Sequence, residues 1–575
     1  MKKQRNKLLK HLWSFLLVFA MVMSVGNANI YAETSSGTKA TDKYYNVNQG
    51  YGDEPWIVCR PDNNYPGRNQ CLSPRLVEGA DGALYCTFEW GERGASGEYV
   101  FPIYKSINKG RTWEKISEIN NDDSIHPDLW LNAQTGEAET ENADGAKLYQ
   151  WQLHNCPQLF VLPEKMGDIP RGALICAGNA VTIEKDAAKV SDAGDGGLWK
   201  TSLDMYYSVD GGVTWSYLST IAEGGRNIMG YDPIWEPFLL WHENQLICYF
   251  SDERVYNYRN NQKLVHCTTT DGIHWSETVD DVAFAGNNKR PGMPIVTKLE
   301  NGKWMMVYEG VGISRPFTSF FKISDDPLKW NPSETGEVLW RSGSPYVTTL
   351  SDGTIAAGTS ATGDILLNTK KDGTGTWVPR HTGAPAGYNR CFVQLSSGEL
   401  LVVGSTAAFG NGQKDSYVYV KSLDINTDLK VDELEEMTFI QNETDGKVAG
   451  VWQSSLNAGA NVVLWDNTNA ADQLWLLNRQ TDGTYYIKNG NSGKFMTQQI
   501  NEEGSNLIQE DFDKSNSMQS WSIEEDDGKF LIKNNATNMY ISRNPNSDEV
   551  KLILTGTLSG DNSKWIFTNS VGLAN

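Results

Sequence analysis

The sequence predicts an all-β chain built from two successive repeat architectures. A strand-turn-strand pattern recurs six times between residues 73 and 406, and most copies are followed by a turn rich in Asp, Gly and Trp. A different pattern recurs three times after residue 438. Self-similarity at a fixed period is typical of arrays of small sheets. We therefore expect a six-bladed β-propeller followed by a second, smaller β domain.

Each of the six units opens on a short segment, here called the slot, that leads into an apolar strand. The slots begin at Ser73, Cys156, Glu236, Met293, Ser344 and Arg390. A turn and a second apolar strand follow, as in 82–86 and 302–306. Only the third slot has a carboxylate at its first position. This residue, Glu236, lies between Trp235 and Pro237 and is the unusual member of the repeat.

A second signature follows the strand pair in most units, and we place it in the turn between the third and fourth strands. Residues 106–113 and 208–215 match the Asp-box pattern S-x-D-x-G-x-T-W, with Asn108 in place of Asp in the first, and looser versions occur at 269–275, 324–330 and 371–377. In such a hairpin the Asp accepts backbone N–H bonds and the Gly takes a positive φ. The pattern predicts four antiparallel strands per unit and a structural role for the turn.

The propeller is expected to span residues 41–430. A ring must join its ends to remove open sheet edges. We therefore expect residues 41–60, ahead of the first repeat, to supply an outer or closing strand to the last unit.

The part of the sequence after the propeller is read as a linker, 431–437, and a separate domain, 438–575. Its repeats end near Gln473-Leu474-Trp475, Gln519-Ser520-Trp521 and Ser563-Lys564-Trp565, about 45 residues apart. This pattern resembles the ricin B-type β-trefoil, a carbohydrate-binding fold. The Gln and Trp positions of that repeat belong to its core, so they indicate the fold but do not identify the sugar-contacting residues.

The amino terminus predicts export. Five Lys and Arg residues precede the apolar run 12–25, and small-residue cleavage sites follow, so residues 1–32 read as a signal peptide. No later run of about 18 apolar residues occurs, and we expect a secreted, extracellular protein without a membrane span in its mature form. The formal net charge of −21 argues against nucleic acid as a partner, because that needs basic patches. We expect the mature chain to act as a monomer.

Eight cysteines in an exported chain raise the question of disulfides. Cys86, Cys176 and Cys248 occupy one repeated position in the second strand, where small buried apolar residues explain them better than bridges do. Cys59 and Cys71 could pair, and the sequence leaves this open.

The repeat also predicts where chemistry could occur. The start of the first strand and the end of the second meet on one face of a propeller, around its centre. The residues at the second-strand end are Glu89, Asn179, Ser251, Glu309, Ser360 and Thr406. Glu236 and Glu309 therefore face the centre from adjacent blades, with Glu89 and Asp252 as further candidates. Paired carboxylates are what glycoside hydrolysis requires.

The segments Trp235–Leu239 and Tyr308-Glu309-Gly310, set in such a propeller, resemble glycoside hydrolase family 93 over about residues 44–430. The resemblance implies an exo-α-1,5-L-arabinanase that releases arabinobiose from the non-reducing end of plant cell-wall arabinan or a related polysaccharide, with retention of configuration. It implies that Glu236 and Glu309 are the catalytic pair. Which is the nucleophile and which the acid/base stays open.

Other side chains near the slots are candidates for substrate binding. Tyr388 could bond a catalytic carboxylate, Arg390 could hold one ionised, and Trp90 and Trp235 could stack on sugar rings. The remaining candidates are His154, Asn155, Arg68 and Arg290. No phosphate-binding loop and no zinc-ligand spacing occurs, so no cofactor and no metal is expected.

Two other functions remain open from the sequence. A sialidase shares the six-bladed Asp-box propeller and needs three arginines, which Arg60, Arg390 and either Arg290 or Arg315 would supply, with Tyr388 and Glu309. It would leave Glu236 without a role, and the expected F/Y-R-I-P signature is absent. A non-catalytic glycan-binding protein is the second alternative, which the paired Glu residues argue against.

Overall fold

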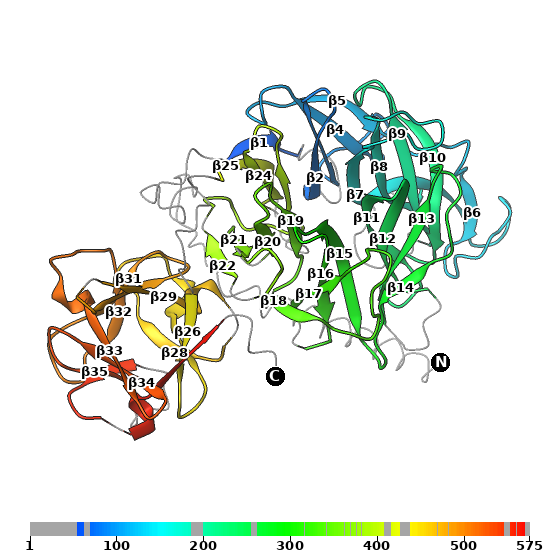
Figure 1. Cartoon of the computed structure of the whole chain (residues 1–575). Coiled ribbons are helices and arrows are strands. Elements are labelled where there is room, and N and C mark those ends of the chain that lie inside the picture. Colours follow the sequence, from blue (N-terminus) through cyan, green and yellow to red (C-terminus); the bar gives the residue numbers. More distant parts are fainter. Residues whose placement is uncertain are drawn as a thin grey trace, which may run out of the picture. The chain divides into compact units, whose positions relative to one another are not determined.

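The computed structural model describes residues 55–61, 70–185, 199–254, 261–314, 317–340, 342–360, 363–368, 370–374, 377–380, 382–406, 416–425, 437–467, 470–480, 482–544, 552–558 and 560–569. They form two compact units, one within 55–425 and one within 437–568 (Figure 1). The predicted signal peptide lies outside the described residues, as does the predicted linker except for Met437. No helix in the described part of the chain has the length and apolarity to cross a membrane.

The first unit is the predicted six-bladed β-propeller. Blades 1, 3, 4 and 5 each have four sequential antiparallel strands, blade 2 has a fifth strand, and blade 6 takes one of its four strands from ahead of blade 1. Blades 1 to 3 contain β2 Leu72–Glu78, β3 Leu84–Glu89, β4 Phe101–Ser106, β5 Glu114–Ile119; β7 Ala146–Val161, β8 Leu174–Glu184, β9 Thr201–Ser208, β10 Ser216–Gly224; and β11 Ile234–His242, β12 Gln245–Asp252, β13 Lys263–Thr269, β14 Val279–Val282. Blades 4 to 6 contain β15 Arg290–Lys298, β16 Trp304–Val311, β17 Ser319–Ser324, β18 Glu337–Trp340; β19 Tyr346–Thr349, β20 Ile355–Gly358, β21 Ile365–Asn368, β22 Val378–Arg380; and β23 Cys391–Gln394, β24 Leu400–Ser405, β25 Val418–Leu423.

The innermost strands form a closed ring. Contacts run from β2 to β7, β11, β15, β19 and β23, and β23 returns to β2. Strand β1, Trp56–Cys59, completes blade 6 by pairing with β25, with Trp56 opposite Val420. The predicted closing strand is therefore confirmed, and it removes the open edge that β25 would otherwise present.

Blade 2 differs from the others in a way that the sequence analysis did not predict. Its first strand, β7, has 16 residues and its second, β8, has 11. An added strand, β6 Leu129–Asn132, pairs with the front part of β7, with Leu129 opposite Tyr149. The residues ahead of the slot at Cys156 thus extend blade 2 beyond the common length.

Every slot contains a residue with a positive φ. The values are 48° at Ser73, 52° at Cys156, 59° at Glu236, 57° at Met293, 54° at Ser344 and 55° at Asn389. In blades 1 to 4 the ladder register shifts at this point, as a β-bulge requires. Five of these residues precede proline, whose missing N–H suits a bulge. Such non-glycine conformations are uncommon and often occur at functional sites.

The prediction that the sixth slot begins at Arg390 is wrong by one residue. Asn389, not Arg390, has the positive φ. Blade 6 lacks the proline that marks the other five slots, so the sequence offered no fixed point for the alignment.

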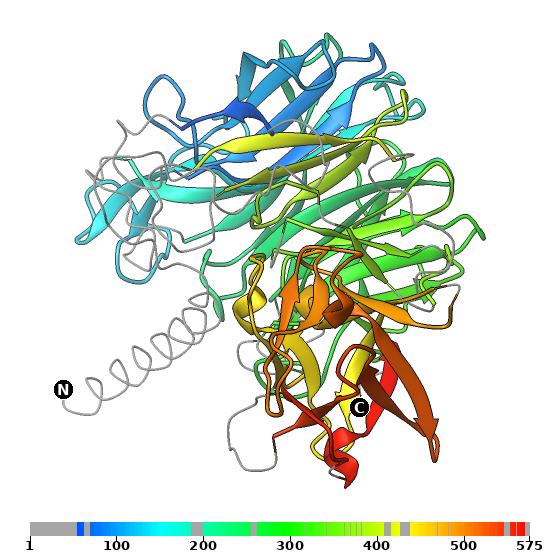
Figure 2. The same cartoon turned by 90° about the vertical axis from the view of Figure 1, so that its left-hand side faces the viewer.

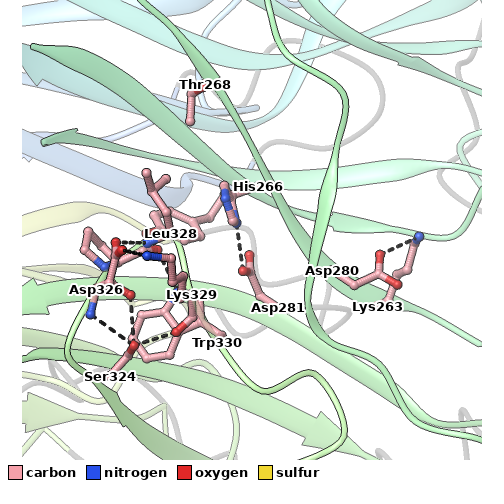
Figure 3. Close-up of polar contacts among 12 residues, drawn as sticks. Lys263, His266, Thr268, Asp280, Asp281, Ser324, Asp326, Leu328, Lys329 and Trp330 are labelled. Carbon is pink, nitrogen blue, oxygen red and sulfur yellow. Dashed lines mark hydrogen bonds and ion pairs between the residues drawn. The ribbon is translucent and has the colours of Figure 1, made fainter. Parts of the chain in front are cut away.

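The turns between third and fourth strands have the hydrogen bonds expected of them. Asp210 Oδ1 accepts from the backbone N–H of Thr214 at 3.0 Å, and Trp215 Nε1 donates to the carbonyl of Gly212 at 3.1 Å. Figure 3 shows the shorter version in blade 4, where Asp326 accepts from the N–H of Leu328 at 3.0 Å. These turns fasten the outer strands of each blade.

Clusters of apolar side chains fill the spaces between blades, and some polar groups are buried with them. One of these is His266 of β13, whose Nδ1 lies 2.7 Å from the fully buried Asp281 of β14 (Figure 3). Cys86, Cys176 and Cys248 are buried opposite Leu76, Leu159 and Leu239, and all eight cysteines are free thiols. The apolar interpretation of these three positions is confirmed.

The second unit is the predicted β-trefoil, drawn from yellow to red in Figures 1 and 2. Its three lobes contain β26 Met437–Asn442, β27 Val448–Val451, β28 Val462–Trp465, β29 Leu474–Arg479; β30 Tyr485–Asn489, β31 Phe495–Gln498, β32 Leu507–Glu510, β33 Trp521–Asp526; and β34 Lys529–Asn534, β35 Tyr540–Arg543, β36 Leu552–Thr555, β37 Trp565–Asn569. Short 3₁₀ turns are η2 Trp452–Ser454, η3 Ala471–Gln473, η4 Ser517–Gln519 and η5 Gly560–Ser563.

The three repeated tryptophans form the centre of this unit. Trp475, Trp521 and Trp565 are fully buried in one core, and each indole N–H donates to a main-chain carbonyl at 2.8, 3.0 and 3.1 Å. They stabilise the fold and leave sugar binding to other residues.

Candidate active site

Glu236 and Glu309 meet at one end of the propeller, on either side of Gly292. Glu236 lies at the start of β11 in blade 3, and Glu309 lies near the end of β16 in blade 4. Gly292 is the ladder partner of Glu309. A Cβ atom placed on Gly292 would lie 3.2 Å from Oε2 of Glu236. Two carboxyl groups 73 positions apart in the chain are therefore brought together by the ring.

Both carboxylates accept a hydrogen bond from the bulge of the next blade. Glu236 Oε2 accepts from the N–H of Met293 and from the hydroxyl of Ser251, each at 2.7 Å. Glu309 Oε2 accepts from the N–H of Ser344 at 2.7 Å. The bulge turns each N–H out of its own ladder and toward the neighbouring blade, which explains why the slot conformation recurs.

A second glycine makes room for Glu309. A Cβ atom on Gly343 would lie 2.0 Å from Oε2 of Glu309, far inside the contact limit of real atoms. Gly343 and Gly292 thus allow the two carboxyl groups to approach the backbone closely. Both glycines matter because they lack a Cβ atom.

Burial and mutual charge set the proton affinity of the pair. Burial raises the pKa of Glu236, and the bonds from Ser251 and Met293 and the charges of Arg290 and Arg75 oppose this rise. Burial also raises the pKa of Glu309 to about 7, against the Ser344 bond, and the charge of Glu236 adds to the rise. Near neutral pH the pair can therefore hold one proton.

Tyr388, predicted beside the carboxylates, lies there. Burial raises the pKa of its phenol well above the usual value, and the charges of Glu236, Glu309 and Glu89 raise it further. Its hydroxyl lies 3.8 Å from Sδ of Met293. At neutral pH it is a neutral phenol between three acids.

Arg290 and Trp235 are joined through Glu253, a residue that the sequence analysis missed. Glu253 Oε1 accepts from Nη2 of Arg290 at 2.6 Å and from Nε1 of Trp235 at 3.1 Å. Nη2 of Arg290 also donates to Gln262 at 2.7 Å. Because the charge of Arg290 lowers the pKa of both Glu236 and Glu309, Arg290 belongs to the site.

The prediction that Arg390 holds a catalytic carboxylate is wrong. Its side chain is buried and donates to the carbonyls of Gly363, Thr359 and Asp364 at 2.8, 2.7 and 2.9 Å. It ties blade 6 to blade 5. Arg290 and Arg75 supply the positive charge near Glu236 instead.

Three further residues that were predicted to contact the substrate are buried: His154, Trp90 and Asn155. His154 packs its ring against Tyr99 and Trp90, with centroids 4.5 and 5.6 Å away. Trp90 itself is buried, so it is not available to stack on a sugar. Asn155 is buried and accepts from Nδ2 of Asn227 at 3.3 Å, which ties blade 2 to the segment before Glu236. Arg68 lies outside the described residues.

The two additional carboxylates have different surroundings. Glu89 accepts from the hydroxyl of Ser73 at 3.1 Å and from the bulge N–H of Cys156, so it repeats the arrangement of Glu309 in blade 1. Asp252 pairs with Arg254 at 3.0 Å and is structural. Glu89 occupies the same repeat position as Glu309, at the end of the second strand. This signal in the sequence could have ranked Glu89 above Asp252 as a site residue.

The trefoil has one distinctive surface feature. Trp452 and Trp465 are 44% and 48% exposed, with ring centroids 6.0 Å apart. By ladder position their counterparts are Gln499 and Glu510 in the second lobe and Asn544 and Thr555 in the third. Only the first lobe therefore offers paired indoles, which suit the faces of sugar rings. Within the described ranges, no cluster of His, Cys, Asp and Glu is arranged to hold a metal.

Comparison with solved structures shows close relatives of the propeller. The α-L-arabinofuranosidase from Fusarium graminearum, solved with an iminosugar inhibitor, is 30% identical, with a TM-score of 0.54 over 66% of this chain and 100% of its own. The same enzyme with arabinobiose, described as a glycoside hydrolase family 93 member, gives 29% identity and 0.55 over the same shares. The α-L-arabinanase from Penicillium chrysogenum, with arabinobiose, gives 30% and 0.53 over 65% and 99%.

The trefoil has its own match. The family described as ricin-type beta-trefoil lectin domain-like matches residues 431–510. A search of curated protein sequences finds no match.

Proposed function

Because this chain belongs to glycoside hydrolase family 93, we propose that it is a secreted, retaining, exo-acting hydrolase that cleaves α-1,5-linked L-arabinan from the non-reducing end and releases arabinobiose. The chain is a glycosidase with a lectin-type trefoil attached. The finer statement rests on one observation above all, the meeting of Glu236 and Glu309 across Gly292.

In the proposed reaction one carboxyl group donates its proton to the glycosidic oxygen while the other attacks the anomeric carbon. The bond to the leaving arabinan breaks and a glycosyl–enzyme ester forms. Water then attacks that carbon, and the first residue takes the proton from the water. A pair that holds one proton at neutral pH, as the burial of Glu236 and Glu309 favours, is the form that this cycle needs.

The surrounding residues would support this chemistry. The N–H groups of Met293 and Ser344 fix one oxygen of each carboxyl group, which leaves the other oxygen for the substrate. Arg290 lowers the pKa of both acids and so opposes the effect of burial. Tyr388, a neutral phenol between them, is suited to bond whichever carboxylate becomes charged.

The roles of the two acids can be assigned by azide rescue of the alanine variants. The small anion replaces a missing nucleophile and gives a glycosyl azide of inverted configuration. With the acid/base missing, azide opens the ester and gives a product of retained configuration. The raised pKa values of Glu236 and Glu309 do not fix these roles, because bound sugar changes the solvation of both groups.

The sialidase alternative is not favoured by these contacts, because Arg390, one of its arginines, is used by backbone carbonyls. The deciding experiment incubates the purified protein with linear α-1,5-arabinan, arabino-oligosaccharides and a sialoside, and identifies the released sugar. We expect arabinobiose from the first two substrates only. Release of sialic acid, or of no sugar at all, would overturn the proposal.

A further inference from the structure

The seam where the propeller closes contains two cysteines in one buried cluster. Cys59 ends the closing strand β1 of blade 6, and Cys71 immediately precedes β2 of blade 1. Interaction with Cys59 adds to the effect of burial in raising the pKa of the Cys71 thiol. Their backbones are held near the same strand, since Cys59 is opposite Val418 and the N–H of Cys71 donates to Ser416 at 3.2 Å.

We propose that Cys59 and Cys71 are a cross-linking site, and that a small disulfide such as oxidised glutathione converts them into a disulfide that fastens β1 to the start of blade 1. Among the other described cysteines, the thiols of Cys86 and Cys248 donate to carbonyl oxygens of their own strands at 3.8 Å.

The seam gains more from a covalent link than any other part of the ring. The closing strand has four residues, three ladder partners in β25, and a register shift just before Cys59. By contrast, Cys248 and Cys267 lie opposite each other on strands already joined by seven ladder pairs. A disulfide between residues 59 and 71 would therefore hold β1 in blade 6, the blade whose strands come from both ends of the propeller sequence.

The polar surroundings of Cys59 provide a route for its proton. Its Sγ donates to Oε1 of Glu92 at 3.5 Å, and Glu92 is paired with Lys115 at 2.7 Å, which reaches solvent. Tyr104 lies 2.6 Å from the same carboxylate oxygen. Burial raises the pKa of Cys71. Cys59 is the thiol that already has a carboxylate acceptor for its proton.

The exchange balances without a further reactant. Cys59 gives its proton to Glu92, and the thiolate attacks one sulfur of the small disulfide and releases the first small thiol. Cys71 loses its proton to water, attacks Sγ of Cys59 and releases the second. The small disulfide gains two electrons and two protons, and the protein loses the same. Because both thiols are buried, we expect the reaction during folding or while the end of β1 is open.

The test uses the whole chain, folded in a mixture of reduced and oxidised glutathione, then denatured without reductant and treated with iodoacetamide. Peptide mapping should find the peptide of Cys59 linked to that of Cys71, with the other six cysteines alkylated. Reductant should lower the Tm of the wild type by a few degrees. It should leave the Tm of the double variant C59S/C71S unchanged, while the control C248S/C267S should respond as the wild type does.

Alkylation of all eight cysteines in the wild type would overturn the proposal, as would a link that joins any other pair. If the double variant fails to fold, the wild-type map still decides, and C59S alone should leave Cys71 open to alkylation.

Discussion

The carboxylate of Glu309 in blade 4 accepts a hydrogen bond of 2.7 Å from the N–H of Ser344 in blade 5. Ser344 has a φ of 54°, which turns this N–H away from its own strand. A candidate catalytic carboxylate is therefore held by the backbone bulge that recurs at the start of each blade.

Removing either carboxyl group should abolish most activity and spare the fold. We expect E236A and E309A each to lower kcat on arabino-oligosaccharides by about 10³-fold or more, because each loses one of two obligatory steps. The measurement is steady-state kinetics beside circular dichroism. Asp252, bound to Arg254, is the matched control, and D252N should retain most turnover if it folds. Full activity in either Glu variant would contradict the assignment.

The pH–rate profile should be bell-shaped, because the reactive pair holds one proton. Burial places the pKa of Glu309 at about 7, so kcat/KM should fall as pH rises above that value and the last proton leaves. The pKa of Glu236 is also raised, so the acid limb should lie above the usual range for Glu. Activity that is constant from about pH 6 to 9 would contradict this picture.

The same shift predicts how stability depends on pH. The folded-state pKa of Glu309 is above its unfolded value, so its contribution is fully present at low pH and is lost as pH rises toward 7. E309Q cannot ionise, and it should be more stable than the wild type at about pH 8 by about 3 kcal/mol. The difference should vanish near pH 4. Urea unfolding at the two pH values gives the comparison, and a gap of equal size at both would refute the claim.

Gly343 should be required for catalysis although it carries no functional group. In G343A the new Cβ would lie 2.0 Å from Oε2 of Glu309, so the carboxylate must leave the N–H of Ser344. We expect kcat to fall by about 10²-fold. Gly556 of the trefoil, whose nearest neighbour would be 3.5 Å away, is the control position for the same change. Equal effects of the two substitutions would argue against a steric role at Gly343.

The paired indoles of the first trefoil lobe should hold polysaccharide. We expect W452A/W465A to weaken retention on insoluble arabinan by about tenfold, since stacking area is lost at both rings. Deletion of residues 438–575 should do the same. Neither change should alter turnover of short oligomers. Mutating Gln499 and Glu510, the counterparts in the second lobe, tests whether the effect is specific to the first.

Much of the fold and of the candidate site could be predicted from the sequence, because equivalent positions of the repeat occupy equivalent places in successive blades. The slot repeat located Glu236 and Glu309 at equivalent ends of adjacent blades, and the closing strand followed from the need to remove an edge. Burial is not contained in such a pattern. His154 stands just before a slot and Trp90 just after Glu89, yet the ring of His154 packs against both Tyr99 and Trp90.

Contacts across blades were the other information that the sequence lacked. Glu253 joins Arg290 of β15 to Trp235 of β11, and no local signal marks it. The extension of blade 2 by β6 was also missed, because an added strand breaks the repeat from which the other strands were inferred.

The closing strand has a consequence for how the protein is made. Trp56 of β1 must wait for Val420 of β25, so the last sheet cannot form until nearly the whole propeller sequence has been synthesised. Such distant pairing slows folding. During that delay β1 is without its partner strand, and it can pair with β25 of a second copy, which makes strand exchange between chains the characteristic folding error to expect.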